Sequence, residues 1–470
     1  MLKRIFYNFT YLSIGQILSG VLYFIAIVFI ARSFGAGKFG VFSFAEASFF
    51  FFSLIVLFGT DIIGMREISK AEKKDKAAIV NSVVSLRSLF CLSAFFILSI
   101  FIIFLKNSLE TKLVILICVS AIFSLVFLLD WFFWGEERFV VYSFFPIIRD
   151  LFFFLGVLFL INFKASFLWV GVVFLISKLL GSGFLLVKYS CKYGFPGISW
   201  DKKLDRQFFA SSAMMFATAL VGWIVGYFNI FVISFFVGES GTGLYSAAYK
   251  PISFVLLAIM VGVKSIFPYL SKSAMTRKSD FRKIVIFALL GIAVLFTPLM
   301  LLGNAVSSEI MGLIYGSVFI ESGKLFYFLI FAAFIIAINT VYSRSLVAAG
   351  EDRSNFIANI SVGVINIIAS LISVYKWGIV GAAFSMIIGD GIVFFYYHWK
   401  LSKIMRIPLL KIAIVPISAM VISTMFVFLL KLHINHFLGL IINGGIYFII
   451  ACSLVFILYR HKKNFLLKYI

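Results

Sequence analysis

The sequence predicts an all-α polytopic membrane protein with about fourteen transmembrane helices. Of its 470 residues, 63% are hydrophobic and only 13% are charged, and the mean hydropathy is +1.12. The apolar runs are long and are separated by short charged stretches. This is the pattern of a chain that crosses a bilayer many times, with roughly 20 apolar residues in each helix. We therefore expect nearly the whole chain to lie in a membrane.

The charged segments set the ends of the predicted spans and their orientation. The spans are residues 8–33, 40–64, 78–105, 112–134, 139–161, 167–188, 207–237, 243–270, 284–306, 325–346, 355–375, 378–399, 411–431 and 437–459. Lys and Arg gather in every second loop, as in "REISKAEKKDK" (66–76), which predicts that both chain ends lie in the cytoplasm. The first span is too long for a signal-peptide core, so we expect it to be retained. Topology and contact with anionic lipid account for the net charge of +22, and no nucleic acid partner is expected.

The stretch "FGAGKFG" (34–40) contains the G-x-G-x-x-G pattern that elsewhere binds dinucleotides. That pattern is informative only after a strand and before a helix of a βαβ unit. Here it joins two predicted spans on the outer face, so no nucleotide site is expected. We expect the glycines to form a tight turn between the spans.

A second copy of this turn occurs 203 residues later. "VGESGTGLYSAAYK" (237–250) aligns without a gap with "FGAGKFGVFSFAEA" (34–47), so that Gly35 pairs with Gly238 and Gly40 with Gly243. An offset of six helices lets both copies enter the membrane in the same direction. The repeat predicts two pseudo-symmetric, parallel six-helix lobes, residues 1–203 and 204–405. Residues 406–470 then supply two C-terminal helices and a basic cytoplasmic tail.

Metal, disulfide and nucleophile patterns are weak. The four cysteines, Cys91, Cys118, Cys191 and Cys452, are scattered without a close pair and are expected to be packing residues. The histidines of "HINH" (433–436) fall in an outer turn without a nearby carboxylate. We therefore expect no metal and no cofactor, and an ATP-driven pump would need a separate subunit because the chain has no Walker loop.

Several stretches resemble one known family. They are "DIIGMREISK" (61–70), the glycine turn with its echo, "VAAGEDRSNFIANI" (347–360) and "YKWGIVGAAFSMIIGD" (375–390). The chain resembles the polysaccharide repeat-unit (O-antigen and capsule, Wzx-like) flippases of the multidrug/oligosaccharidyl-lipid/polysaccharide exporter superfamily over about its whole length. It departs from that pattern in having Ala36 where a proline is common, and in lacking a partner for "GIVGAA" in the first lobe. Both departures leave the subfamily open.

The resemblance implies a function. It implies that a polyprenyl-pyrophosphate-linked oligosaccharide moves from the inner to the outer leaflet of a bacterial cytoplasmic (inner) membrane by alternating access between the lobes, for surface polysaccharide and lipopolysaccharide synthesis. It also implies energy from H⁺, Na⁺ or the membrane potential, and polysaccharide polymerase machinery as a partner. Membrane lipids surround the chain.

Charged side chains inside spans are the candidate functional residues, because an intramembrane charge costs several kcal/mol unless it faces a cavity or a partner. The proposed cationic lining for the pyrophosphate is Lys250, Lys264, Arg149 and Lys178, and the proposed ion-coupling carboxylates are Asp61, Glu46 and Asp150. At the 203-residue offset Asp61 aligns with Lys264, so the second lobe is expected to be basic where the first is acidic.

The remaining intramembrane charges have a simpler interpretation. For Arg87, Asp130 and Asp390 we favour an ion pair or a position near a span end.

Arg149 and Asp150 are consecutive, so they are expected to point different ways around the helix and to need separate partners.

Two alternative functions stay open. One is a drug or lipid II exporter on the same scaffold. The other is a membrane-embedded enzyme, such as a polysaccharide polymerase or ligase. Such an enzyme should carry a sizeable outer loop with clustered catalytic groups, whereas the longest predicted outer stretch is roughly residues 307–324.

Overall fold

A computed structural model of the protein describes residues 2–105, 107–199, 202–276, 278–429, 445–447, 449–451 and 453. Throughout these residues the regular structure is helical, as the sequence predicted. The helices are α1 (Leu2–Leu57), α2 (Thr60–Lys70), α3 (Lys76–Phe104), α4 (Leu109–Ser120), α5 (Phe123–Val126), α6 (Asp130–Gly135), α7 (Phe139–Asn162), α8 (Leu168–Tyr193), α9 (Lys202–Phe236), α10 (Glu239–Thr276), α11 (Lys278–Tyr315), the 3₁₀ turn η1 (Ser317–Phe319), α12 (Ser322–Ala348), α13 (Asp352–Ser402) and α14 (Leu409–Leu429).

Ten helical stretches in the described part of the chain are long and apolar enough to cross a membrane. Two of them contain a reversal at a glycine with positive φ. Gly35 has φ 77° within α1, and Gly378 has φ 58° within α13. L residues with a side chain rarely adopt this conformation. Each of these two helices is therefore a hairpin that holds two of the predicted spans.

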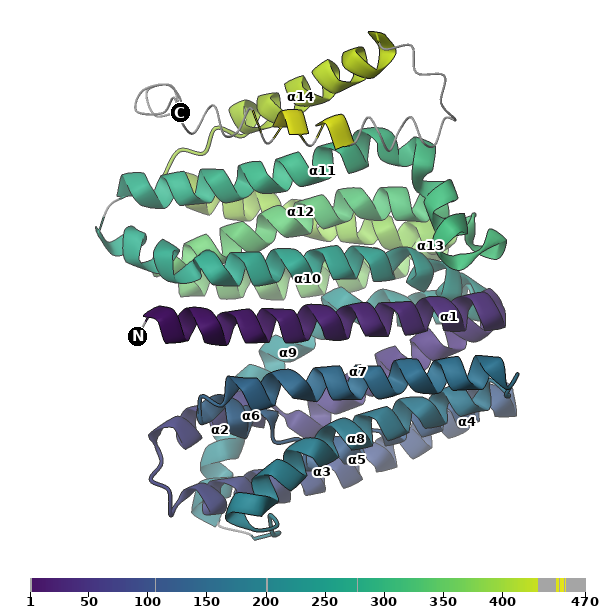
Figure 1. The fold of residues 1–470 in the computed structure, drawn as a ribbon, viewed down its shortest axis with the longest axis vertical. Helices are drawn as coiled ribbons and strands as arrows, with labels where there is room; N and C mark the ends of the chain where they lie inside the picture. The colour runs from purple at the N-terminus through teal and green to yellow at the C-terminus, as the bar shows by residue number, and fades with distance from the viewer. Residues whose placement is uncertain are drawn as a thin grey trace. The chain divides into compact units, whose positions relative to one another are not determined.

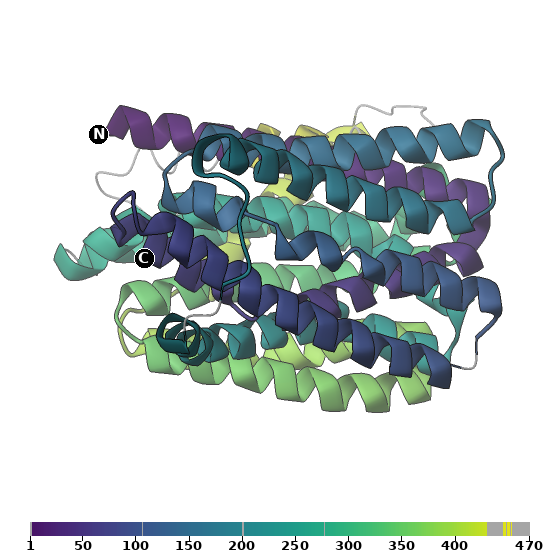
Figure 2. The same ribbon diagram turned by 90° about the horizontal axis from the view of Figure 1, so that it is seen from below.

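The first of two compact units comprises Met1–Ser246. In it α1 packs against α7, and α7 lies beside α8 (Figure 1). Figure 2 shows the same unit from below, where α3 runs beside the α4 and α5 segment. α9 packs against α1, α2 and α3. The boundary between the units lies inside α10, after Ser246, and the predicted lobe limits at 203 and 405 remain predictions.

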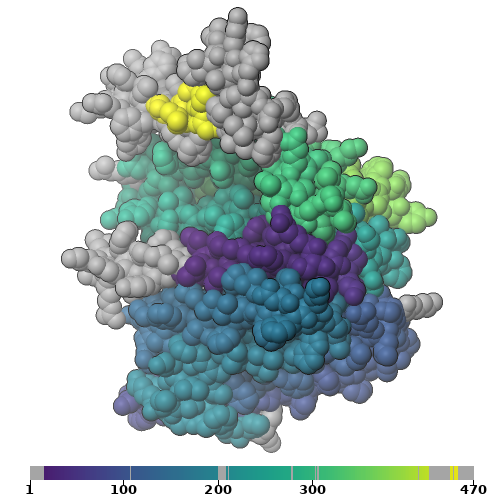
Figure 3. Space-filling view, turned by 45° about the vertical axis from the view of Figure 1, so that its right-hand side comes forward, coloured from purple at the N-terminus to yellow at the C-terminus, as the bar shows by residue number. Residues whose placement is uncertain are grey.

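Large apolar side chains point outward from the long helices. On α3, Leu92 is 65% exposed, Phe96 67% and Ile103 73%. Such a surface would be unfavourable in water over whole helices and is the surface that lipid tails cover. In the space-filling view the described side chains of α1, in purple, lie directly against the blue surface of α7 (Figure 3). The protein is a multi-pass membrane protein.

Two predicted spans are interrupted. The span 40–64 breaks at Phe58 and Gly59, which both have positive φ, and the span 112–134 is divided among α4, α5 and α6. The fully buried Arg87 of α3 joins both breaks. Its Nε donates to Thr60 Oγ1 at 2.9 Å, and its Nη1 donates to the carbonyl oxygen of Leu128 at 2.8 Å. Arg87 thus satisfies backbone carbonyls that the interrupted helix leaves open, in place of the expected ion pair or span-end position.

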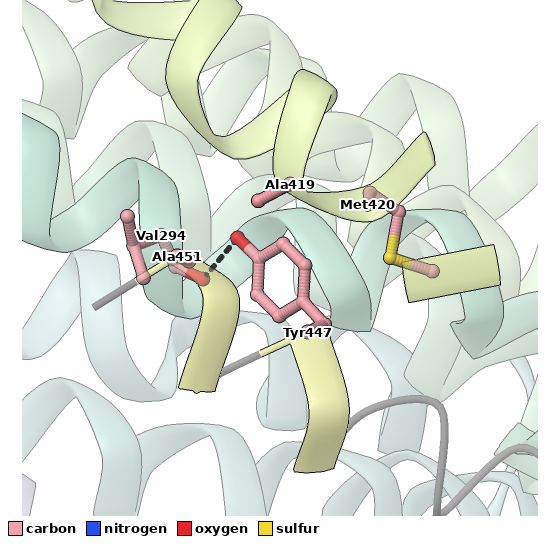
Figure 4. Packing of buried hydrophobic residues seen from close by; sticks show 5 residues of the cluster. All are labelled: Val294, Ala419, Met420, Tyr447 and Ala451. Carbon is pink, nitrogen blue, oxygen red and sulfur yellow. Dashed lines mark hydrogen bonds between the residues drawn. The ribbon is translucent and has the colours of Figure 1, made fainter. Parts of the chain in front are cut away.

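The second unit comprises Ala247–Ile470, in which α12 packs against α11 and α13, and α14 packs against α11. Figure 4 shows a small cluster of this unit around Tyr447, whose hydroxyl donates to the carbonyl oxygen of Val294 at 2.8 Å. Ala419 and Met420 of α14 belong to the same cluster. Most of the predicted span 437–459, together with the basic tail, lies outside the described residues.

The repeated glycine turns touch each other reciprocally within the first unit. A Cβ atom on Gly40 would lie 1.8 Å from the carbonyl oxygen of Glu239, and one on Gly243 would lie 1.9 Å from that of Ala36. Ala36 and Glu239 are themselves separated by 203 positions, the offset of the repeat. The two copies therefore make the same backbone contact twice, at a distance that only glycine allows.

Candidate functional site

Polar and charged side chains gather in the middle of the first unit. We call this group the first-unit polar cluster; it draws on both arms of α1 and on α7 and α8. Its members are Ser19, Tyr23, Glu46, Arg149, Asp150 and Lys178. Charges so placed inside membrane helices are functional candidates by default.

Arg149 and Asp150 form a bidentate ion pair. Arg149 Nε donates to Asp150 Oδ1 at 2.7 Å, and Nη2 donates to Oδ2 at 2.7 Å. The expectation of separate partners was wrong, because the long guanidinium side chain folds back to its neighbour. The Ser19 hydroxyl of α1 also donates to Asp150. The side chain of Asp150 is 3% exposed and that of Arg149 is 26% exposed. The Arg149 side chain is therefore less completely covered by its neighbours than the Asp150 side chain.

Glu46 and Lys178 lie nearby. Glu46 is buried and accepts a hydrogen bond from the Tyr23 hydroxyl. The Lys178 ammonium lies 4.7 Å from the ring centroid of Phe174 and 5.4 Å from that of Phe49, a cation–π arrangement. Its charge also acts on Asp150. Two carboxylates and two cations therefore share one buried region.

Aromatic rings surround these charges. Phe153 stacks on Tyr23 at 5.4 Å between ring centroids and meets Phe174 edge to face at 5.9 Å. Phe49 also meets Phe174 edge to face. Rings of this size exclude water and lower the local dielectric, which strengthens each ionic contact.

The remaining predicted residues lie elsewhere. Asp61 is half-buried at the start of α2, where its charge and that of Asp130 act on Arg87. Lys250 and Lys264 are on α10 in the second unit; Lys250 is half-buried and Lys264 is exposed. The structure thus brings Glu46, Arg149, Asp150 and Lys178 together in the first unit. Asp61 belongs to the same unit but not to this cluster, and Lys250 and Lys264 belong to the second unit.

Sequence reasoning missed Ser19 and Tyr23. A hydroxyl in an apolar span gives little signal by itself. The spacing of four residues is the signal that was available, because it places both hydroxyls on one face of the first span.

Metal and thiol sites are not apparent in the described part of the chain. No group of three or more His, Cys, Asp and Glu side chains is arranged there to hold a metal ion. Cys91 and Cys118 are buried as expected, whereas Cys191 is exposed. Cys452, His433 and His436 lie outside the described residues.

Comparison with known proteins identifies the family. Residues 5–274, more than half of the chain, match the polysaccharide biosynthesis protein family. The chain belongs to this family. Within a 182-residue stretch it is 24% identical to a probable low-salt glycan biosynthesis flippase, Agl15, of Haloferax volcanii; the match spans 38% of this chain and 39% of that protein.

Solved structures share the fold of this polysaccharide biosynthesis protein. A lipid II flippase MurJ in an inward closed conformation matches with a TM-score of 0.78 and 21% identity, over 96% of this chain and 99% of that one. An inward-facing multidrug resistance MATE family transporter of the MOP superfamily matches with a TM-score of 0.66 and 13% identity, over 82% and 94%. The chain is therefore a polysaccharide biosynthesis protein family member whose fold is shared by a lipid II flippase and by a multidrug transporter.

Proposed function

We propose that the protein moves a polyprenyl-pyrophosphate-linked oligosaccharide repeat unit from the inner to the outer leaflet of a bacterial cytoplasmic membrane, for surface polysaccharide synthesis. The family match over residues 5–274 carries this proposal. The fold shared with a lipid II flippase supports it. In this proposal both chain ends lie in the cytoplasm, and transport proceeds by alternating access. Polysaccharide polymerase machinery then takes up the translocated repeat unit.

The pyrophosphate requires cationic groups while the lipid tail stays in the bilayer. The proposed ligands are Arg149 and Lys178 in the first unit and Lys250 and Lys264 in the second. A phosphate contact to Arg or Lys in a partly dry cavity contributes roughly 1.5–3 kcal/mol. Arg149 already binds Asp150, so the phosphate has to compete with that carboxylate.

This competition offers a mechanism for coupling. When Glu46 and Asp150 are ionised, they balance the charges of Arg149 and Lys178. Neutralising either carboxylate with H⁺, or screening it with Na⁺, leaves the cluster with excess positive charge. This excess charge favours binding of the pyrophosphate. Release of the ion restores the Arg149–Asp150 pair and expels the phosphate. Asp61, near Arg87, is the third proposed coupling carboxylate.

The proposal is tested by surface polysaccharide in a strain that lacks its own flippase. The double variant Lys250→Gln, Lys264→Gln should insert in the membrane but restore little polysaccharide, whereas arginine at both positions should restore it. Lys283→Gln is the control, because Lys283 is exposed and pairs with Asp280 at 3.2 Å. Full restoration by the double glutamine variant would remove the phosphate-binding role of these lysines.

Lipid II export is a second candidate function. The shared fold with a lipid II flippase, at a TM-score of 0.78, favours it over drug export, because the MATE transporter matches at 0.66. This alternative predicts that the protein restores growth to cells depleted of their lipid II flippase. It also predicts that the protein restores no surface polysaccharide in the strain that lacks its own polysaccharide flippase.

A further inference from the structure

One face of the second arm of α13 carries large apolar side chains that stay exposed in the described part of the chain. Ile388, Ile392, Phe395 and Trp399 are 43%, 51%, 72% and 51% exposed. Their spacing of four, three and four residues places them on one side of the helix. We call this face the α13 stripe. Between its ends the helix rises by about 16 Å, which is about half of the hydrocarbon thickness of a bilayer. The stripe is therefore about as long as one leaflet is deep.

Two lysines lie around the indole ring at the end of this stripe. The Lys403 ammonium lies 3.6 Å from the ring centroid of Trp399, and the Lys400 ammonium lies 5.4 Å from the same centroid. Lys400 also lies 6.0 Å from the ring centroid of Tyr396. These cation–π contacts hold both ammonium groups against the exposed rings, where their stems cover apolar surface. The basic groups are thus placed where the apolar stripe ends.

The two ammonium groups have no acidic partner in the part of the chain that the structure describes. Neither Lys400 nor Lys403 forms an ion pair with a carboxylate there. A further cation follows at Arg406, whose carbonyl oxygen accepts a hydrogen bond from Nε of Arg282 on α11 at 2.8 Å. Like charges that lie close together repel one another, and an anion placed among them removes this cost. The end of the α13 stripe is therefore electrostatically suited to a negatively charged group.

We propose that the α13 stripe and its two lysines bind one anionic phospholipid. The acyl chains lie along the apolar stripe, and the phosphate contacts Lys400 and Lys403 at the level of Trp399. Indole rings are enriched at this headgroup level of membrane proteins, and basic groups beside the membrane attract anionic lipid. The assignment of this lipid to the inner leaflet rests on the proposed orientation of the chain, but its binding does not.

The combination of a long apolar face with cations at one end distinguishes a lipid from a soluble anion. Inorganic phosphate would contact the lysines but would gain nothing from the stripe. A zwitterionic lipid would cover the stripe but would bring no net charge to the lysines. Each lysine beside anionic lipid strengthens binding about fivefold, so two lysines together contribute about thirtyfold.

Lipid binding is tested by native mass spectrometry of the purified full-length protein in an uncharged detergent. Phosphatidylglycerol and phosphatidylcholine with the same acyl chains are titrated separately. The first phosphatidylglycerol molecule should reach half-saturation at a concentration about thirtyfold lower than phosphatidylcholine. The double variant Lys400→Gln, Lys403→Gln should remove this difference, whereas arginine at both positions should keep it.

Fluorescence locates the lipid independently. Phosphatidylglycerol with bromine atoms near the start of its acyl chains should quench part of the tryptophan emission. The chain has seven tryptophans, so the quenching that disappears in Trp399→Phe isolates the contribution of this position. Quenching that is the same in the unaltered protein and in Trp399→Phe would overturn the proposed position of the lipid.

Lys376→Gln is the matched control, because Lys376 is an exposed lysine beside the exposed Trp377 at the reversal of the same hairpin; it should keep the full preference for phosphatidylglycerol. Equal half-saturation of the two lipids in the unaltered protein, or an unchanged preference in the double glutamine variant, would overturn the lipid site. Displacement of phosphatidylglycerol by inorganic phosphate at constant ionic strength would also overturn it, because the site would then take a soluble anion. None of these results bears on glycan transport, which the surface polysaccharide assay judges separately.

Discussion

Asp150 receives hydrogen bonds from Arg149 and from Ser19, and so ties α7 to α1. Removing one member of a buried ion pair leaves the other charge without compensation, whereas removing both does not. The structural role of this pair can therefore be separated from its proposed role in coupling.

We expect Asp150→Asn to destabilise the protein by about 2 kcal/mol. This is less than the loss expected for a fully buried pair, because the Arg149 side chain is 26% exposed. The double variant Arg149→Gln, Asp150→Asn should recover most of this stability in thermal unfolding but still fail to restore surface polysaccharide. Arg66→Gln, at an exposed pair with Glu67, is the control. A double variant that is stable and also active would show that the pair is only structural.

Glu136 lies in the turn between α6 and α7, outside the membrane spans, and binds Lys76. Burial raises the pKa of the Glu136 carboxyl. The hydrogen bond and charge of Lys76, with the charges of Lys192 and Arg138, lower it more, so the net pKa is below its ordinary value of 4.5. Its contribution to stability is therefore present at neutral pH and is lost as the pH falls through the folded-state pKa.

We expect Glu136→Gln to lower stability by about 1 kcal/mol at pH 7. The difference from the unaltered protein should shrink as the pH falls from about 4.5, the ordinary pKa at which the unfolded chain takes up the proton, through the lower folded-state pKa of Glu136. Unfolding temperatures measured from pH 7 down to about pH 3 test this. A difference that stays constant over that range would rule out the ionic contribution.

At the scale of helices, hydrophobic run length predicted most of the spans, and the glycines of residues 34–40 predicted the reversal at Gly35. The interruption of the span 112–134 was not predictable in this way. The segment "SAIFSLVFLL" (120–129) contains no proline or glycine, and its open carbonyls are satisfied by Arg87, which is distant in sequence. A break stabilised by tertiary contact leaves no local signal.

The grouping of the candidate-site residues was likewise not predictable from the local sequence. Glu46, Asp150, Arg149 and Lys178 were found because a charge in an apolar run is conspicuous. Their grouping depends on how α1 packs against α7 and α7 against α8, which the sequence does not specify.

We expect Arg87→Met to lower the unfolding temperature by several degrees. The Thr60 hydroxyl and the carbonyls of Leu125 and Leu128 would lose the donor that they share, and each buried acceptor left without a hydrogen bond costs about 1–3 kcal/mol of stability. Arg87→Lys should recover only part of this, since an ammonium lacks the planar geometry. An unchanged unfolding temperature for Arg87→Met would mean that the interrupted helices do not depend on this residue.

For the whole molecule, the proposed orientation places the glycine turns outside the cell. Cysteines at the exposed positions Lys38 and Ser240, in a background without Cys91, Cys118 and Cys452, should react with an impermeant thiol reagent in intact cells. The exposed native Cys191, at the opposite end of the first unit's helices, should react only after lysis and is the internal control. The reverse pattern would invert the topology.

The reciprocal contact of the two glycine turns also bears on the origin of the chain. In oligomers, a patch that meets its own copy, so that position i touches j while j touches i, defines an isologous two-fold interface. Gly40 meets Glu239 and Gly243 meets Ala36 with this reciprocity. An ancestral six-helix subunit that dimerised through its first turn would make the same pair of contacts between two identical chains. Gene duplication and fusion would then have enclosed an old dimer interface within a single polypeptide.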